Sequence, residues 1–367
     1  MMALGEVRVA RRVLLAGGLA ATAVTVSGMP AVAGSRRMAP SIASTADWDA
    51  RAASGSIQVL DSKPTKIVVH HTATPNAEDT SQAHAFELCR QIQNYHMDSN
   101  GWIDTGQNFT NSRGGYLMEG RHQSLAALRG GSQHVRGAHA GEQNSVALGI
   151  ENEGTYTEAA VPSALWSSLV ELCSYMVAQY GIAAGEIYGH RDFMATACPG
   201  AVLYGRLPEL RAQVGARTGS PVVQPVTWPL VVPGASGDVV SALQLLLRAR
   251  GFGVPVDGVF GAGTVRAAEA VVRRRGAAEG SCLAARVVEP GLFGGQAWLE
   301  VTPELVRGAE GDAVRAAQVL LRARGVSMSV DGVFGDSMVS VVREFRGSRG
   351  LVASGVVDEV VWRWLLS

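Results

Sequence analysis

The pattern of apolar and polar positions predicts an α/β domain in the first part of the chain. A β-branched run from Lys66 to Thr72 predicts a strand that places Val68, His70 and Thr72 on one face. Helical periods predict one helix that begins at Asp79 or Thr80 and ends near Met97, and a second over Ser163–Tyr180. Further strands are expected at Asn108–Thr110, Gly115–Glu119 and Val146–Glu151. This alternation predicts a mixed β-sheet flanked by helices, within a domain that we place at residues 56–214.

The remainder of the chain contains an internal repeat with an offset of 74 residues. Gly237-Asp238, Gln244 and Val256-Asp257-Gly258-Val259-Phe260-Gly261 return as Gly311-Asp312, Gln318 and Val330-Asp331-Gly332-Val333-Phe334-Gly335. Each copy has an amphipathic helix before the Asp-Gly-Val-Phe-Gly turn, so two small all-α modules are predicted at 229–300 and 301–367. The first copy carries about ten extra residues around Cys282–Gly291.

The two ends of the α/β domain are bounded by segments of a different composition. Residues 1–33 contain Arg11-Arg12, an apolar run and small residues before a cleavage point after Ala33, which predicts a signal peptide of the twin-arginine kind. The general secretory route is the alternative, and the apolar run is short for a membrane anchor. We interpret 34–55 as a leader and the Pro- and Val-rich residues 215–228 as a linker.

Charge and cysteine content exclude some partners and leave one question open. Lys+Arg and Asp+Glu are balanced at 32 each, which argues against nucleic acid and against docking on an anionic membrane. After removal of the signal peptide, no segment is expected to insert stably in a membrane. Cys89 and Cys173 fall on apolar helix faces, where both free buried thiols and a disulfide remain possible.

Three residues suggest a metal site. His70 lies at the end of a predicted strand, His190 lies in Gly189-His190-Arg191-Asp192, and Cys198 precedes Pro199-Gly200. Two imidazoles and one thiolate suit zinc, and three protein ligands leave the fourth position open for water or substrate. Each of the eight histidines could equally have a structural role.

Six ordered motifs resemble the type-2 N-acetylmuramoyl-L-alanine amidase family, which includes peptidoglycan recognition proteins. They are Val68-Val69-His70-His71-Thr72, Gly101-Trp102-Ile103-Asp104-Thr105-Gly106, Glu119-Gly120-Arg121, Gly137-Ala138-His139-Ala140, Gly149-Ile150-Glu151 and Gly189-His190-Arg191-Asp192 through Cys198-Pro199-Gly200. The C-terminal copies resemble peptidoglycan-binding repeats. The resemblance implies that His70, His190 and Cys198 bind Zn²⁺, that Thr196 contacts the oxyanion, and that His71 is structural.

The chain departs from the family at Gln107, where relatives carry Tyr or Glu. Glutamine cannot act as a general base, so we expect Gln107 to position water or the oxyanion, with Glu119 or Glu151 as the proton-transfer partner. His96, His122 and His139 fit positions of subfamilies, although local hydrogen bonding explains them equally well.

The resulting hypothesis is an exported zinc amidase that cuts peptidoglycan between the muramic acid lactyl group and L-alanine, secreted or held at the cell wall. Two alternatives remain at this stage: a non-catalytic peptidoglycan receptor, and an amidase that cuts within the stem peptide.

Overall fold

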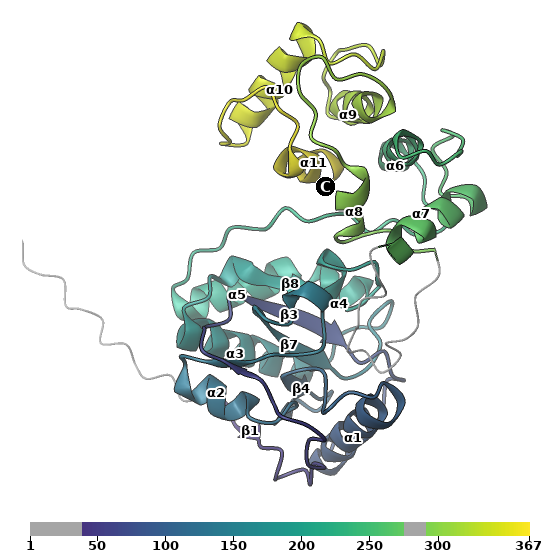
Figure 1. The fold of residues 1–367 in the computed structure, drawn as a ribbon. Helices are drawn as coiled ribbons and strands as arrows, with labels where there is room; N and C mark the ends of the chain where they lie inside the picture. The colour runs from purple at the N-terminus through teal and green to yellow at the C-terminus, as the bar shows by residue number, and fades with distance from the viewer. Residues whose placement is uncertain (1–38, 275–290) are drawn as a thin grey trace, which may run out of the picture. The chain divides into compact units, whose positions relative to one another are not determined.

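The computed structural model describes residues 39–274 and 291–367. Its first part is built on a six-stranded mixed sheet in the order β1-β5-β4-β7-β3-β8, of which β1, β3, β4, β7 and β8 are labelled in Figure 1. A second sheet consists of β2 and β6. The expected mixed sheet flanked by helices is therefore confirmed. The strands are β1 (Ile42–Ala43), β2 (Val59–Leu60), β3 (Lys66–His71), β4 (Phe109–Asn111), β5 (Leu117–Glu119), β6 (His134–Val135), β7 (Ala147–Asn152) and β8 (Ile187–Gly189).

Strand β3 lies inside the sheet and pairs in parallel with both β7 and β8. Its alternating side chains separate two environments. Ile67 and Val69 face a large apolar core, whereas Val68 and His70 face the opposite side. Because the three strands are parallel, their carboxyl ends meet at one edge of the sheet, which is where functional residues of α/β proteins commonly gather.

Helices cover both faces of the sheet (Figure 1). On the face of Ile67 and Val69, α3 and α5 pack together in the large core. On the other face, Ala85 and Cys89 of α1 contact Met118 of β5. The helices of this part are α1 (Gln82–Asn94), α2 (Ser124–Gly130), α3 (Ser163–Tyr180), α4 (Ala201–Gly205) and α5 (Leu207–Thr218).

The segment that we expected to be a leader, 34–55, is part of the domain over its described residues. Ile42 and Ala43 form β1 in parallel register with β5. Trp48 is fully buried, and its indole nitrogen donates to the Glu119 carbonyl at 2.9 Å. The sequence did not indicate this role, because most residues of the segment are small or polar. Only Trp48 and the two residues of β1 supply these contacts. The signal peptide predicted at 1–33 lies outside the described residues.

The predicted linker also begins later than expected, because α5 continues to Thr218. Beyond it, the Ser220 hydroxyl accepts from the Ala184 amide at 2.9 Å, and the Gln224 side chain accepts from Arg211 at 3.0 Å. Residues 219–227 therefore contact the α/β domain without forming a helix or strand, and they are not a free spacer.

In each C-terminal repeat the described residues form three helices around a turn that is held by a buried glutamine. The Gln244 side chain donates to Asp257 and accepts from the Gly258 amide, and Gln318 makes the same pair of bonds to Asp331 and Gly332. These contacts explain why Gln and Asp-Gly recur together at the offset of 74 residues. The helices are α6 (Asp238–Ala249), α7 (Ala262–Arg274) and α8 (Ala297–Val301), then α9 (Asp312–Ala323), α10 (Asp336–Ser348) and α11 (Glu359–Leu366).

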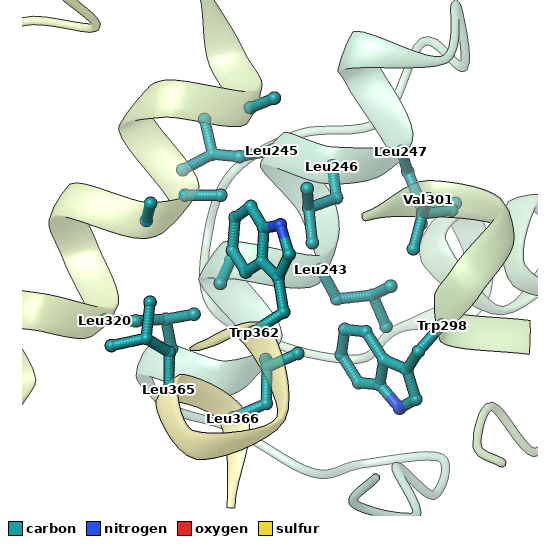
Figure 2. Close-up of a cluster of buried hydrophobic side chains, with 14 of the residues drawn as sticks. Leu243, Leu245, Leu246, Leu247, Trp298, Val301, Leu320, Trp362, Leu365 and Leu366 are labelled. Atoms are coloured by element: carbon teal, nitrogen blue, oxygen red, sulfur yellow. The ribbon is translucent and has the colours of Figure 1, made fainter. Parts of the chain in front are cut away.

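The two repeats share one apolar core, so they form a single packed unit rather than two separate modules. Leu245 and Leu246 of α6 lie with Leu320 of α9 and Trp362 of α11 in the cluster of Figure 2. Phe260 and Phe334 of the two Asp-Gly-Val-Phe-Gly turns are both fully buried in it. Most of the extra residues of the first repeat, including Cys282, lie outside the described residues.

Cys89 and Cys173, for which a disulfide was one of two alternatives, do not form one. Both thiols are free and buried, but Cys89 lies in the α1 cluster and Cys173 in the α3 core, on opposite faces of the sheet. Among the residues that the structure describes, no helix is long and apolar enough to cross a membrane.

Candidate metal centre

The structure brings His70, His190 and Cys198 together at the carboxyl ends of β3 and β8. Their potential ligand atoms lie within 4.8 Å of one another, and the three residues are at most 2 % exposed. The Cys198 sulfur is 3.7 Å from His70 Nδ1, which identifies Nδ1 as the nitrogen that faces the cluster. This arrangement is the one that the sequence motifs imply.

A short turn places His190 at the end of β8. The Asp192 carboxylate accepts from the Gly189 amide at 2.8 Å and from the Tyr204 hydroxyl at 2.6 Å, which fixes the turn that directs His190 inward. The Arg191 amide then donates to the Cys198 carbonyl at 2.9 Å. The spacing of His190 and Cys198 is thus held by backbone contacts across the loop.

The chemical state of the cluster suits a metal cation. Burial lowers the pKa of His190 to about 3 and the pKa of His70 well below its usual value, so both rings are neutral near pH 7 and offer a lone pair. Within residues 39–274 and 291–367, the buried His190 Nδ1 has no hydrogen-bond partner, a costly state that metal coordination relieves. The His71 amide donates to the Cys198 sulfur at 3.4 Å, which favours a thiolate. The three residues therefore fit a metal ion.

Thr196 lies beside this cluster, where its hydroxyl accepts from the Cys198 amide at 3.1 Å. The hydroxyl proton remains available for another acceptor. His71 belongs to the same strand, but its ring accepts from the Tyr156 amide at 3.2 Å, a backbone contact of the structural kind that we expected. Burial lowers the pKa of His71 to about 4.

Glu151 is placed next to His70 by the sheet register. The two residues are partners in the parallel pair of β3 and β7, so their side chains point to the same face of the sheet. Glu151 is 1 % exposed. On the far side of Glu151, Thr110 of β4 is its partner and accepts from the Gln107 side-chain amide at 3.0 Å. Gln107 is fully buried, and its Oε1 has no hydrogen-bond partner within the described part of the chain, so its side-chain hydrogen bond is the one to Thr110.

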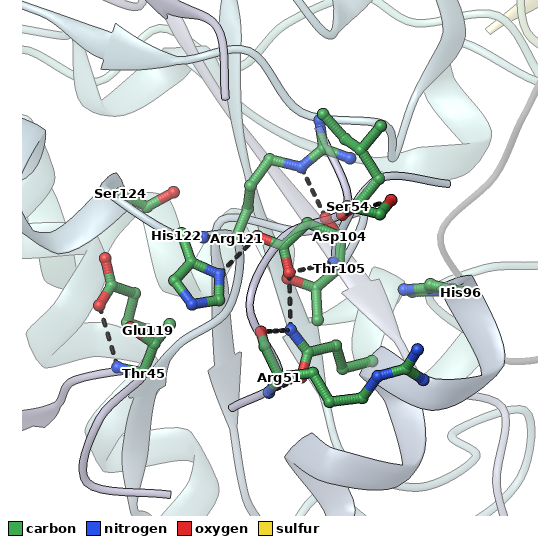
Figure 3. A network of polar contacts seen from close by, with 12 residues as sticks. Thr45, Arg51, Ser54, His96, Asp104, Thr105, Glu119, Arg121, His122 and Ser124 are labelled. Carbon is green, nitrogen blue, oxygen red and sulfur yellow. Dashed lines mark hydrogen bonds and ion pairs between the residues drawn. The ribbon is translucent and has the colours of Figure 1, made fainter. Parts of the chain in front are cut away.

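The structure does not bring Glu119 to the cluster. In the strand order β5, β4, β7 and β3 are successive neighbours, so Glu119 is three strands away from His70, or about 14 Å at ~4.8 Å per strand. Glu119 is in register with Phe109, which faces the large core on the opposite side of the sheet from His70. Its carboxylate accepts from the Thr45 amide at 3.1 Å (Figure 3). It also accepts from the Leu125 amide at 2.8 Å.

Sequence reasoning left the role of two further residues undefined. His139 Nδ1 lies 3.1 Å from His70 Nε2. The motif Gly137-Ala138-His139-Ala140 was the sequence feature that could have pointed to a role for His139 at the site. His190 Nε2 contacts the sulfur of Met194, which no sequence pattern indicated. His122, by contrast, bonds the buried Asp104 carboxylate at 2.8 Å in the network of Figure 3.

Comparisons with known proteins identify the family of each part of the chain. Residues 60–201 match the family model described as N-acetylmuramoyl-L-alanine amidase, and residues 310–365 match a putative peptidoglycan binding domain. Peptidoglycan-recognition protein SC1a of Drosophila melanogaster is 32 % identical over 167 residues, which are 45 % of this chain and 83 % of that protein. The chain belongs to this amidase and peptidoglycan-recognition family.

Other relatives are named as N-acetylmuramoyl-L-alanine amidases. The N-acetylmuramoyl-L-alanine amidase of Homo sapiens is 29 % identical over 183 residues, covering 48 % of this chain and 30 % of that protein. Among solved structures, wild-type Drosophila PGRP-LB is 26 % identical with a TM-score of 0.40, covering 46 % of this chain and 92 % of its own.

Proposed function

We propose that the chain is a zinc-dependent N-acetylmuramoyl-L-alanine amidase, which hydrolyses the amide between the muramic acid lactyl group and L-alanine. The cluster of His70, His190 and Cys198 is the observation that carries the proposal. Two neutral imidazoles and a thiolate form the donor set of a catalytic zinc site with one open position. Proteins that only recognise peptidoglycan have no need of this ligand set, which favours an enzyme over a receptor.

When bound, zinc would polarise the lactyl carbonyl and lower the pKa of a water molecule toward ~7. The residues of the chain then divide the remaining work. Glu151, beside His70 on the same face of the sheet, is the group that we propose to accept the proton of the attacking water and deliver it to the leaving nitrogen. Thr196, beside Cys198, donates its hydroxyl proton to the developing oxyanion.

Gln107 has an indirect part in this proposal. It is fully buried and donates to Thr110, the cross-strand partner of Glu151. We therefore assign it a positioning role for the Glu151 carboxylate, and we assign the proton transfer, which a glutamine cannot perform, to Glu151. Glu119 has no part, because its carboxylate is engaged on the other face of the sheet.

The setting that we propose for this reaction is the bacterial cell wall. The predicted signal peptide at 1–33 would export the chain, and the C-terminal unit of two repeats would hold it on insoluble peptidoglycan. Such a tether raises the local concentration of enzyme at its substrate without entering the chemistry.

Truncation after Thr227 tests the division of labour between the two parts. Thr227 contacts the Tyr204 hydroxyl, whereas the next residue, Trp228, stacks on Trp298 of the first repeat at 6.2 Å between ring centres. The truncated protein is expected to cleave a small soluble muropeptide near the full rate and to lose binding to purified wall in a sedimentation assay. Equal losses on soluble and insoluble substrates would show instead that the repeats complete the active site.

The reaction itself is tested by the products formed from a purified muropeptide. The proposal predicts a free muramoyl carboxylate and a peptide that begins with L-alanine. Intact substrate would favour the receptor, and cleavage between two amino acids would favour an amidase that acts within the stem peptide.

A further inference from the structure

The ring of His70 contacts a second buried histidine on the side away from the metal cluster. His70 Nε2 is 3.1 Å from His139 Nδ1, while His70 Nδ1 faces the Cys198 sulfur. The two ring centres lie 5.1 Å apart with an angle of 87° between the planes. The ring centres, at 5.1 Å, are 2 Å farther apart than the two nitrogens, at 3.1 Å. The rings therefore approach each other through these nitrogens and are not stacked. This contact has the geometry of a hydrogen bond.

The direction of this hydrogen bond follows from the role of His70. A ring that offers the lone pair of Nδ1 to a metal must carry its proton on Nε2. That proton points at His139 Nδ1, which can accept it only if His139 carries its own proton on Nε2. We propose that His139 is the positioning residue that holds His70 in the tautomer and orientation needed for metal binding. The proposal rests on the metal centre of the proposed function.

The surrounding chain builds a socket for the His139 ring. The Asn144 side-chain oxygen accepts from the backbone amides of His139 and Ala140 at 2.7 and 2.9 Å, which fixes the backbone at this point. Two glycines make room for the ring: a Cβ on Gly137 would lie 2.4 Å from it, and one on Gly149 would lie 2.6 Å from it. His139 is fully buried. The ring therefore has little freedom to turn away from His70.

A histidine in this position differs from the more common partner of a metal-bound imidazole, which is a carboxylate or a backbone carbonyl. A neutral imidazole accepts the bond without adding a negative charge to the buried site. Removal of such a partner costs about 10–100-fold in metal affinity in other proteins, because the ring is no longer held in the binding orientation.

Zinc affinity of the full-length protein tests the proposal. His139→Phe keeps a ring in the socket but removes the acceptor, and it is expected to weaken zinc binding about 10–100-fold in competition with a chromophoric chelator. His139→Gln returns an acceptor oxygen and is expected to recover part of that affinity. His134→Phe is the matched control, because His134 is also fully buried but faces the carbonyls of Ser62 and Ser145. It is expected to lower the melting temperature while leaving zinc affinity unchanged.

A second measurement reads the tautomer directly in the metal-free protein. Long-range ¹H–¹⁵N spectra are expected to show the proton of His70 on Nε2 in the parent protein, and a mixture of tautomers in His139→Phe. Parental zinc affinity in both His139 variants, or a parental spectrum with the proton on Nδ1, would overturn the proposal.

If the parent binds no zinc, the proposed metal centre fails, and the spectrum alone decides the role of His139. If the parent binds zinc without hydrolysing muropeptide, the proposed activity fails while the role of His139 stands on its own result.

Discussion

Replacement of Cys198 by alanine is expected to remove the metal and to reduce kcat/KM beyond the ~10²–10³-fold that loss of a single oxyanion donor costs. In the proposed centre the Cys198 sulfur would supply one of three ligands and the only negative charge among them, so the two remaining neutral imidazoles would bind zinc far more weakly. His190→Ala is expected to have the same result, because it deletes the buried Nδ1, which has no hydrogen-bond partner among the residues that the structure describes.

Cys173→Ala is the matched control for this experiment. Cys173 is equally buried, but it lies in the α3 core on the opposite face of the sheet. This variant is expected to retain about one zinc per chain and full activity, with only a modest loss of stability. Elemental analysis that found full zinc in both Cys198→Ala and His190→Ala would contradict the assigned ligand set.

Replacement of Glu151 by glutamine is expected to lower kcat by about 10²–10⁴-fold, the usual contribution of a general acid or base, while the zinc content stays unchanged. The substitution preserves the size of a side chain that is 1 % exposed, so the packing against His70 and Thr110 is retained and the ability to take a proton is lost. The measurement is kcat on a soluble muropeptide together with zinc content.

Glu119→Gln provides the comparison, since both residues are buried strand glutamates of the same domain. Its carboxylate stabilises the fold by accepting from Thr45 and Leu125, so this variant is expected to lower the free energy of unfolding by about 1–3 kcal/mol and leave kcat near the parental value. If Glu119→Gln is the inactive variant, or if Glu151→Gln retains full activity, the proton-transfer role assigned to Glu151 is wrong.

The central strands could be predicted because their residues carry strong local patterns, whereas the grouping of His70, His190 and Cys198 was implied by the resemblance to the amidase family. The run from Lys66 to His71 is β-branched and its alternation places His70 on a defined face. His190 and Cys198 lie in one short segment that is bounded by Gly189 and by Pro199-Gly200. Two residues that are close in the sequence and joined by a short loop also lie close together in the fold. The long helix α3 was likewise predicted with its observed limits, because Gly181 ends its helical period.

Properties that depend on strand order could not be predicted from the same patterns. Glu119 and Glu151 both occur in short strands, and the sequence alone could not say which of them pairs beside His70. The register shows that Glu151 does and that Glu119 lies three strands away. The same limit applies to Cys89 and Cys173, whose helices proved to cover opposite faces of the sheet.

Short anchoring segments were missed for a different reason. Residues 39–55 have a polar composition, yet Trp48 and the two residues of β1 attach them to the domain. The repeat, in contrast, was predicted in detail, since Gln244 and Gln318 bond their own Asp-Gly turns within the same copy. Contacts that are local in sequence leave a pattern, whereas contacts between distant segments do not.

The most direct test of the account is digestion of purified peptidoglycan in H₂¹⁸O by the zinc-loaded full-length protein, followed by mass analysis of the fragments. Hydrolysis of the lactyl amide is expected to place one ¹⁸O in the muramoyl carboxylate and to release peptides with a free L-alanine amine that carry no label. Label in a carboxylate of the stem peptide, or no release of fragments by a protein that holds zinc and binds the wall, would contradict the assignment of the chain as an N-acetylmuramoyl-L-alanine amidase.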